Sequence, residues 1–510
     1  VSPDIEGMPE YSPSTIVEKR KFNEYGVFWP VQKDMAKSSG EFNHDLGINA
    51  FWKKAYISPL TGIIYEDEKE GLIRGYYYTL NSIESDNINV DDISCLPNMC
   101  IHCESHYGRR NRKSPIRGFR TGFGRMNQLL TKEYFKTLPN NSKRKIVAFS
   151  DSREDAAVLA NRVEKEHYND LVHETLISNA YKVLDKITNY QNEKEKNNVY
   201  EYDNIYGRLP ETIKRIIESG ESRRASREQK ARYVRLFQDA NVKVIQISDL
   251  SSLIIEELKH LGINPAGSTM EHQKYRNEGK LFDWHSFLDS SYNWQNGSIE
   301  DESDQGCRSN IAKDIFGGLF YNLETQGIAY PVINQNITFS HGFEALNSIS
   351  NQVISSCLRI IGNGWQRVSF LSTIDFEQGT LSKIKKYLSK VKEHYYLQSD
   401  LDLVEEVINK ISSYNRGRRF NILFEKLSLK FSEEKDSYYQ CSNCNTIHLQ
   451  PSAQICTFCF KSTIPTSATG TCMELQQNNY LAKSALNSKN LIRLRCEELT
   501  GQTDNPIERQ

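Results

Sequence analysis

The sequence lacks the long apolar stretches that cross membranes. No run of about 18 apolar residues occurs in its 510 residues, and its start, VSPDIEGMPE, has no signal-peptide pattern. It also lacks an excess of charge of either sign, since the formal net charge is −1. We therefore predict that no segment spans a membrane. Any contact with nucleic acid must come from a local cluster of cations.

The sequence also lacks the two motifs with which P-loop enzymes hold ATP. No GxxxxGK[ST] loop is present to bind the β- and γ-phosphates. No DExH-type strand end is present to bind Mg²⁺. The chain alone is therefore expected not to hydrolyse ATP.

Cysteines, by contrast, are clustered. There are eleven, partly in CxxC pairs, which favours a reducing compartment with metal sites, and hence the cytoplasm, over a disulfide framework. In CSNCNTIHLQPSAQICTFCF, two CxxC pairs are separated by eleven residues: Cys441, Cys444, Cys456 and Cys459. Each pair can direct two thiolates at one tetrahedral ion, which predicts a structural zinc ribbon in which His448 is not a ligand. One alternative is that the four cysteines are free and structural. The other is a redox dithiol, but a single dithiol would explain only one of the two CxxC turns.

A second cysteine cluster, CLPNMCIHCESHYGRR, is less regular. A second zinc site would use Cys95, Cys100, Cys103 and His106. The alternative is a degenerate ribbon that keeps its fold without metal. The isolated cysteines are expected to be small apolar core residues: Cys307, Cys357, Cys472 and Cys496.

Two stretches are strongly basic. RRNRKSPIRGFRTGFGR contains no acid, and its glycines let a backbone approach closely, so we expect Arg117 and Arg120 to contact phosphates. The alternative is a solvated loop. In the second stretch, SRRASREQKARYVR (222–235), Glu221 and Glu228 flank or interrupt the cations, and a solvated helix face is the preferred interpretation.

KIVAFSDSREDAAVLANRVEKEHY, from Lys145 to Tyr168, predicts a buried parallel strand at 146–149 followed by a helix. Helix residues such as Leu159, Ala160 and Val163 are expected to face the sheet. At the carboxyl end of the strand, Ser150, Ser152 and Arg153 would form a phosphate site. An ordinary strand–turn–helix with a solvated arginine is the alternative.

Three stretches carry a resemblance: RKIVAFSDSREDAAVLANRVE, RLRCEELTGQTDNPIERQ and SPIRGFRTGFGRMNQLLTKEYF. They resemble superfamily 2 DEAD/DEAH-type helicases of the MrfA/YprA-like class, related to the large helicases of the bacterial antiphage systems DISARM and Druantia. The resemblance covers about a quarter of the chain and places the start of the second RecA-like lobe here. It implies that the chain is an internal segment of a helicase or translocase that depends on ATP and Mg²⁺. The substrate implied is DNA, although RNA is not excluded, and the implied partners are other subunits of a defence system.

Thr121, Thr500 and Gly501 are also expected to contact nucleic acid, in addition to the residues named above.

The alternative function is a non-enzymatic zinc-ribbon adaptor that binds DNA or protein and has a degenerate RecA-like lobe.

The fold class expected is multi-domain α+β: a partial α/β RecA-like lobe with a large, mainly helical insertion and a zinc ribbon. Clear helices are expected at DLSSLIIEELKHLG and LSKIKKYLSKVKEHYY, a loop at 290–306 and a strand at 491–496. The expected segments are a strand-rich region (1–94), a cysteine-containing basic loop (95–125), the start of the lobe (126–180), the insertion (181–435), the ribbon (436–465) and a return to the lobe (466–510).

Overall fold

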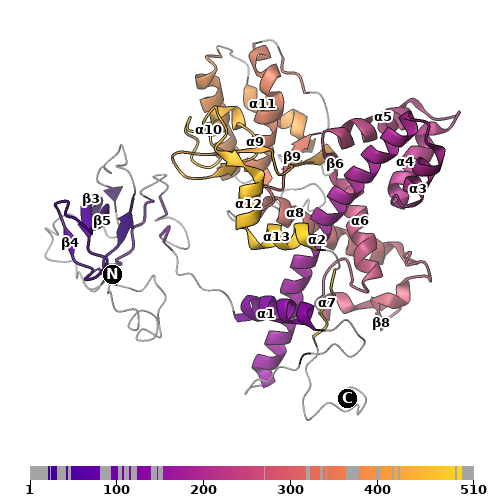
Figure 1. The fold of residues 1–510 in the computed structure, drawn as a ribbon, viewed down its shortest axis with the longest axis horizontal. Helices are drawn as coiled ribbons and strands as arrows, with labels where there is room; N and C mark the ends of the chain where they lie inside the picture. The colour runs from indigo at the N-terminus through magenta and orange to yellow at the C-terminus, as the bar shows by residue number, and fades with distance from the viewer. Residues whose placement is uncertain are drawn as a thin grey trace. The chain divides into compact units, whose positions relative to one another are not determined.

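The chain contains helices and small sheets in two compact units, Val1–Thr121 and Gly122–Gln510 (Figure 1). The computed structural model describes residues 21–22, 25–31, 42–43, 48–80, 93–100, 106–107, 114–116, 123–138, 146, 153–268, 270–317, 322–333, 337–340, 342–362, 378–397, 402–415, 419–422, 426–488 and 491–496. All strand pairs among these residues are antiparallel. The expected mixture of helices and strands is confirmed. No helix in these ranges is long and apolar enough to cross a membrane.

The first unit contains an antiparallel sheet of order β1-β5-β3-β2, with β4 paired to β3. Its strands are β1 (Phe28–Pro30), β2 (Phe42–Asn43), β3 (Asn49–Ile57), β4 (Ile64–Tyr65) and β5 (Ile73–Leu80). Alternate side chains of β3 and β5 point to one face, where Trp52 packs on Tyr78 with ring centroids 5.4 Å apart. The strands expected around FWKKAYISPLTGIIY and GLIRGYYYTL are therefore present.

The second unit is mainly helical. Its helices are α1 (Phe123–Thr137), α2 (Arg153–Glu195), α3 (Val199–Gly207), α4 (Glu211–Glu221), α5 (Arg227–Asn241), α6 (Ile247–His260), α7 (Met270–Gln273), α8 (Gly297–Phe316), α9 (Ser350–Gly362), α10 (Gln378–His394), α11 (Leu403–Ile411), α12 (Cys472–Asn478) and α13 (Tyr480–Asn487).

Short strands connect these helices. They are β6 (Val244–Gln246), β7 (Lys274–Asn277), β8 (Lys280–Asp283), β9 (Ala329–Ile333), β10 (Ser412–Asn415), β11 (Arg419–Ile422), β12 (Leu427–Phe431), β13 (Ser437–Gln440), β14 (Ile447–His448) and β15 (Gly470–Thr471). The sheet β6-β12-β9 lies in the helical core. In the sheet β14-β13-β15, the connection between β13 and β14 contains the first cysteine pair.

Helix α2 is the central element of this unit. It has 43 residues, which corresponds to a length of about 65 Å at 1.5 Å per residue. Helices α1, α3, α5, α6, α8 and α13 all pack against it. Its middle is fully buried at Leu171, Leu176 and Ile177, so one continuous helix forms the core of the unit.

Two helices agree with the sequence-based predictions: α6 ends at the predicted glycine, and α10 forms where a helix was expected. After α6, the Gly262 N–H donates to the Lys259 carbonyl and the Ile263 N–H donates to the Leu258 carbonyl, with Gly262 at a φ of 68°. This is a Schellman motif, which needs a glycine at the left-handed position. The expected helix in LSKIKKYLSKVKEHYY is confirmed as α10.

The loop expected at 290–306 is wrong in its second half, where α8 begins at Gly297. The Asn296 side chain accepts hydrogen bonds from the Ser298 and Ile299 N–H groups and caps the helix. Ile299, Ser303 and Cys307, spaced at four residues, are buried. The Asn-Gly-Ser sequence therefore starts a helix here and does not form a turn.

The strand expected at 491–496 is also absent, because these residues pair with no other strand in the described part of the chain. Instead, the Ile492 carbonyl accepts a hydrogen bond from Nε2 of the buried His167 on α2, 2.6 Å away. Of the strand expected at 146–149, 147–149 lie outside the described residues.

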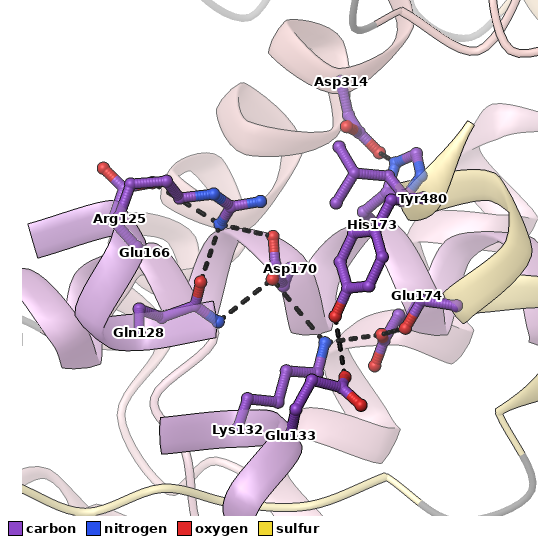
Figure 2. A network of polar contacts seen from close by, with 12 residues as sticks. Arg125, Gln128, Lys132, Glu133, Glu166, Asp170, His173, Glu174, Asp314 and Tyr480 are labelled. Carbon is purple, nitrogen blue, oxygen red and sulfur yellow. Dashed lines mark hydrogen bonds and ion pairs between the residues drawn. The ribbon is translucent and has the colours of Figure 1, made fainter. Parts of the chain in front are cut away.

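A buried network of charges holds α1 on α2 (Figure 2). Lys132 Nζ lies 2.6 Å from Glu174 Oε1 and 3.6 Å from Asp170 Oδ2. Arg125 Nη1 lies 2.7 Å from Asp170 Oδ1. The Lys132 side chain is 2% exposed and both carboxylates are 5% exposed, so their charges are compensated within the protein.

The network explains why polar side chains of α1 are buried while apolar side chains of the same helix are exposed. Gln128 and Lys132 are buried against α2, whereas Met126, Leu130 and Tyr134, which follow at intervals of four residues, are exposed. Helix α13 joins the network through Ser484, whose hydroxyl donates to Glu174 Oε1 at 2.7 Å, while Tyr480 donates to the exposed Glu133 beside it (Figure 2). Charge pairing, more than apolar contact, therefore fixes the position of α1.

We predict that Lys132→Met strongly destabilises the protein. It leaves two buried carboxylates without their shared cation, a loss that typically costs about 3–5 kcal/mol. The free energy of unfolding, measured by urea denaturation followed through helical circular dichroism, should fall accordingly. Lys136→Met is the control, because the Lys136–Glu133 pair is exposed and should contribute less than about 1 kcal/mol. Equal effects of the two substitutions would contradict the importance of the buried network.

Candidate metal centre

The first cysteine pair lies in a tight turn after β13. The Cys441 N–H donates to the Thr446 carbonyl, and the Asn445 N–H donates to the Cys441 carbonyl, both at 2.9 Å. Asn445, directly after Cys444, has a φ of 57°. Asparagine tolerates this left-handed conformation better than most residues. The turn therefore directs both sulfurs to one side.

The second pair repeats this geometry. The Cys456 N–H donates to the Lys461 carbonyl and the Phe460 N–H donates to the Cys456 carbonyl, both at 3.0 Å. Phe460, directly after Cys459, has a φ of 58°. Two matching turns of this kind can place four sulfurs around one tetrahedral ion.

The four sulfurs converge. All four ligand atoms lie within 4.8 Å of one another. The Cys441 and Cys459 sulfurs are 3.7 Å apart, and the Cys444 and Cys456 sulfurs are 3.5 Å apart. Tetrahedral zinc at about 2.3 Å from each sulfur requires separations of about 3.8 Å, whereas a disulfide requires about 2.05 Å. The cluster therefore fits a tetrahedral metal ion such as zinc and not a pair of disulfides.

Polar groups around the sulfurs favour the thiolate form. The Thr463 hydroxyl lies 2.9 Å from the Cys441 sulfur, and the Phe458 N–H donates to the Cys456 sulfur at 3.4 Å. Hydrogen bonds from the thiols of Cys444, Cys456 and Cys459 lower the pKa of Cys441. Hydrogen bonding with Cys441 in turn raises the pKa of Cys456. The thiols thus share their protons, and a cation would displace those that remain.

Little apolar packing supports the turns themselves. Their buried cluster contains only Cys441, Cys456 and Ile464 among the described residues, with half-buried neighbours such as Tyr439 and Phe458. Such a small core does not hold two turns together without a crosslink. A metal ion bound by the four sulfurs would supply this crosslink.

The loop between the two pairs is buried in the helical body, which the spacing did not reveal. Ser452, Ala453 and Gln454 are consecutive residues with φ of 52°, 50° and 61°. Ser452 and Ala453 have no exposed surface. The Ser452 hydroxyl lies 2.7 Å from that of Ser356 on α9, and Tyr387 on α10 donates to the Ser452 carbonyl at 3.1 Å. The cysteine pairs therefore close a loop that α9 and α10 hold.

A buried ion pair adds a second attachment. Arg359 on α9 lies 2.9 Å from Glu324 Oε1 and donates to the Ile447 carbonyl at 2.7 Å. The same guanidinium lies 3.1 Å from His448 Nδ1, and burial together with Arg359 lowers the pKa of His448. A neutral His448 that accepts from Arg359 is not part of the four-sulfur cluster. Arg359 and Glu324 are distant in sequence, so no local signal identifies them.

The second cysteine cluster is described only in part. Cys95 is buried, Cys100 is half-buried and His106 is exposed, while Cys103 lies outside the described residues. The second zinc site therefore stays a prediction. Cys307, Cys357 and Cys472 are fully buried, as core residues would be, and burial raises the pKa of Cys472 to about 11.

Most residues expected to contact nucleic acid also lie outside the described residues: Arg117, Arg120, Thr121, Ser150, Ser152, Thr500 and Gly501. Arg153 begins α2, but its side chain is not described. Their role in phosphate binding stays a prediction.

No protein-family model, curated protein or solved structure matches this chain. The metal centre therefore rests on its own geometry.

We predict that the purified protein contains at least one equivalent of zinc at this cluster. Cys444→Ser with Cys459→Ser removes one ligand from each turn, so metal analysis should show one equivalent less. Cys496→Ser, which alters a half-buried cysteine outside the cluster, should leave the metal content unchanged. An unchanged count in the double variant would rule out the ribbon. A second equivalent that disappears in Cys100→Ser would identify the second site.

Proposed function

We propose that this chain is part of an ATP-dependent nucleic-acid helicase or translocase that acts on DNA in bacterial antiphage defence. The resemblance at 144–164 and 493–510 is the basis of this proposal. One structural observation supports it: α2 begins at Arg153, where the motif requires a helix, and continues as a single helix into the core of the helical body. If the motif at 144–164 moved, α2 would therefore move the helical body with it.

In this proposal, the first turns of α2 belong to the second RecA-like lobe. Val163 is buried, and Leu159 and Ala160 are half-buried, on the face expected to meet the sheet of the lobe. ATP and Mg²⁺ would be held by a longer protein, because this sequence has neither motif that binds them.

The metal would be zinc, and its role would be structural. The loop between the cysteine pairs is buried under α9 and α10, so the ribbon is part of the helical body and not a separate nucleic-acid reader. The body would then be an accessory domain that moves with the motor. The missing ATP motifs favour an alternative, a non-enzymatic zinc-ribbon adaptor that binds DNA or protein and has a degenerate RecA-like lobe.

We predict that the chain binds DNA through its basic loop. Arg117→Ala with Arg120→Ala should weaken binding to unrelated DNA sequences equally, because phosphate contacts carry no base information. The slope of log affinity against log salt should fall by about one unit for each phosphate that is no longer bound. Fluorescence anisotropy with labelled duplexes at several salt concentrations measures both quantities.

The matched control is Lys54→Ala with Lys69→Ala, which removes the same charge from two exposed residues of the first unit. If this control and the arginine variant weaken binding alike, the loop has no specific role. Sequence-dependent weakening would mean that the arginines read bases.

A further inference from the structure

The hairpin of α4 and α5 carries an unusual concentration of positive charge. Residues 222–235 contain six arginines and lysines and one acid, Glu228, in a chain whose net charge is −1. All six cationic residues are exposed. Such a local excess attracts a polyanion at long range.

These cations are mostly uncompensated. Within the described part of the chain, Arg232 pairs with Asp249 at 2.9 Å, but the structure shows no ion pair or hydrogen bond of the side chains of the other five. They are Arg223, Arg224, Arg227, Lys230 and Arg235. Glu221, which precedes the stretch, is engaged by Lys194 on α2 and by the Tyr233 hydroxyl at 3.0 Å. The acid is thus neutralised by the helical body, and the cations remain available.

The backbone that presents these cations is fixed. Ser226 and Gln229 form a capping box at the start of α5, with the Gln229 N–H donating to the Ser226 hydroxyl at 3.1 Å. Gly220 lies against the Tyr233 ring so closely that a Cβ would collide with it, which allows α4 and α5 to approach. A fixed turn loses little entropy when it binds a ligand.

We propose that this hairpin tip, Arg223, Arg224 and Arg227, binds the phosphate backbone of nucleic acid as a second contact surface. The proposal rests on the nucleic-acid function proposed above. Arginines with free guanidinium groups on a fixed turn suit phosphates, which they contact in pairs of hydrogen bonds. The side chains offer no apolar surface for a base, so contact is expected to be independent of sequence.

The tip lies far from the motif at the start of α2. Glu221 pairs with Lys194, near the end of α2, whereas Arg153 begins the helix, about 60 Å away along its axis. Figure 1 shows α3, α4 and α5 grouped at the end of α2 opposite α1. At about 3.4 Å per base pair, one duplex would need about 18 base pairs to reach both places.

The test uses the full chain and a labelled 40-base-pair duplex of mixed sequence, titrated at several salt concentrations by fluorescence anisotropy. Arg223→Gln, Arg224→Gln and Arg227→Gln are combined in one variant. Its affinity should fall and its salt slope should decrease by up to about three units, one for each arginine that no longer binds a phosphate.

The control combines Lys274→Gln, Arg276→Gln and Lys280→Gln, three exposed cations of the β7–β8 hairpin elsewhere on the same unit. It removes the same charge and should bind like the unmodified chain. Circular dichroism and metal content confirm that both variants are folded.

If the tip variant keeps the wild-type affinity and salt slope, this inference is wrong but the proposed nucleic-acid function is not affected. The same holds if the tip variant and the β7–β8 control lose affinity equally. A tip variant that binds DNA normally but no longer binds poly-glutamate would assign the surface to an acidic protein and overturn it too. If the unmodified chain binds no duplex, the proposed nucleic-acid function fails and this inference fails with it.

Discussion

Four thiols within 4.8 Å of one another can all ionise only around a cation, and we infer that the loop between the two cysteine pairs depends on that requirement. The two cysteine turns form the ends of the loop that enters between α9 and α10. Three consecutive residues of this loop, Ser452 to Gln454, have left-handed backbone conformations, each costing about 1–2 kcal/mol for a non-glycine residue. Hydrogen bonds with the hydroxyls of Tyr387 and Ser356 offset part of this cost. A cation bound by the four sulfurs would offset more of it by fixing both ends of the loop.

Charge is used inside the protein in two further places. Arg359 connects α9 to Glu324 and to the ribbon, and Lys132 connects α1 to α2. Removing one partner from such a buried pair costs more than the pair contributes, because the remaining charge is left in a medium of low polarity. These pairs therefore define which elements lie together. The 43-residue α2 runs from Arg153 to the basic hairpin, where Lys194 pairs with Glu221.

Local patterns identified part of this arrangement from the sequence. The CxxC spacing located the metal centre, and Gly262 located the end of α6, because both depend on residues close together in the chain. The prediction of a loop at 290–306 failed because Asn296 and Gly297 can form a turn or start a helix, and burial of Ile299 and Cys307 decides between them. The Arg359–Glu324 pair and the buried Ser452 loop join distant segments, so no periodicity reveals them. The basic stretch at 222–235 was correctly interpreted as exposed. Only the three-dimensional structure shows that, among the described residues, one of its six cations, Arg232, has an ion-pair partner.

Hydrogen exchange of the full chain, before and after removal of zinc by a chelator, tests most directly whether the metal holds the helical body together. Exchange should accelerate in the cysteine turns and, by a similar factor, in the loop at 449–455 and in α9, because they lose the fixed loop ends. Helix α6, which packs against α2, α4 and α8, should change little. Faster exchange confined to 441–461, with α9 unchanged, would show that the metal stabilises only its own turns and would contradict this account.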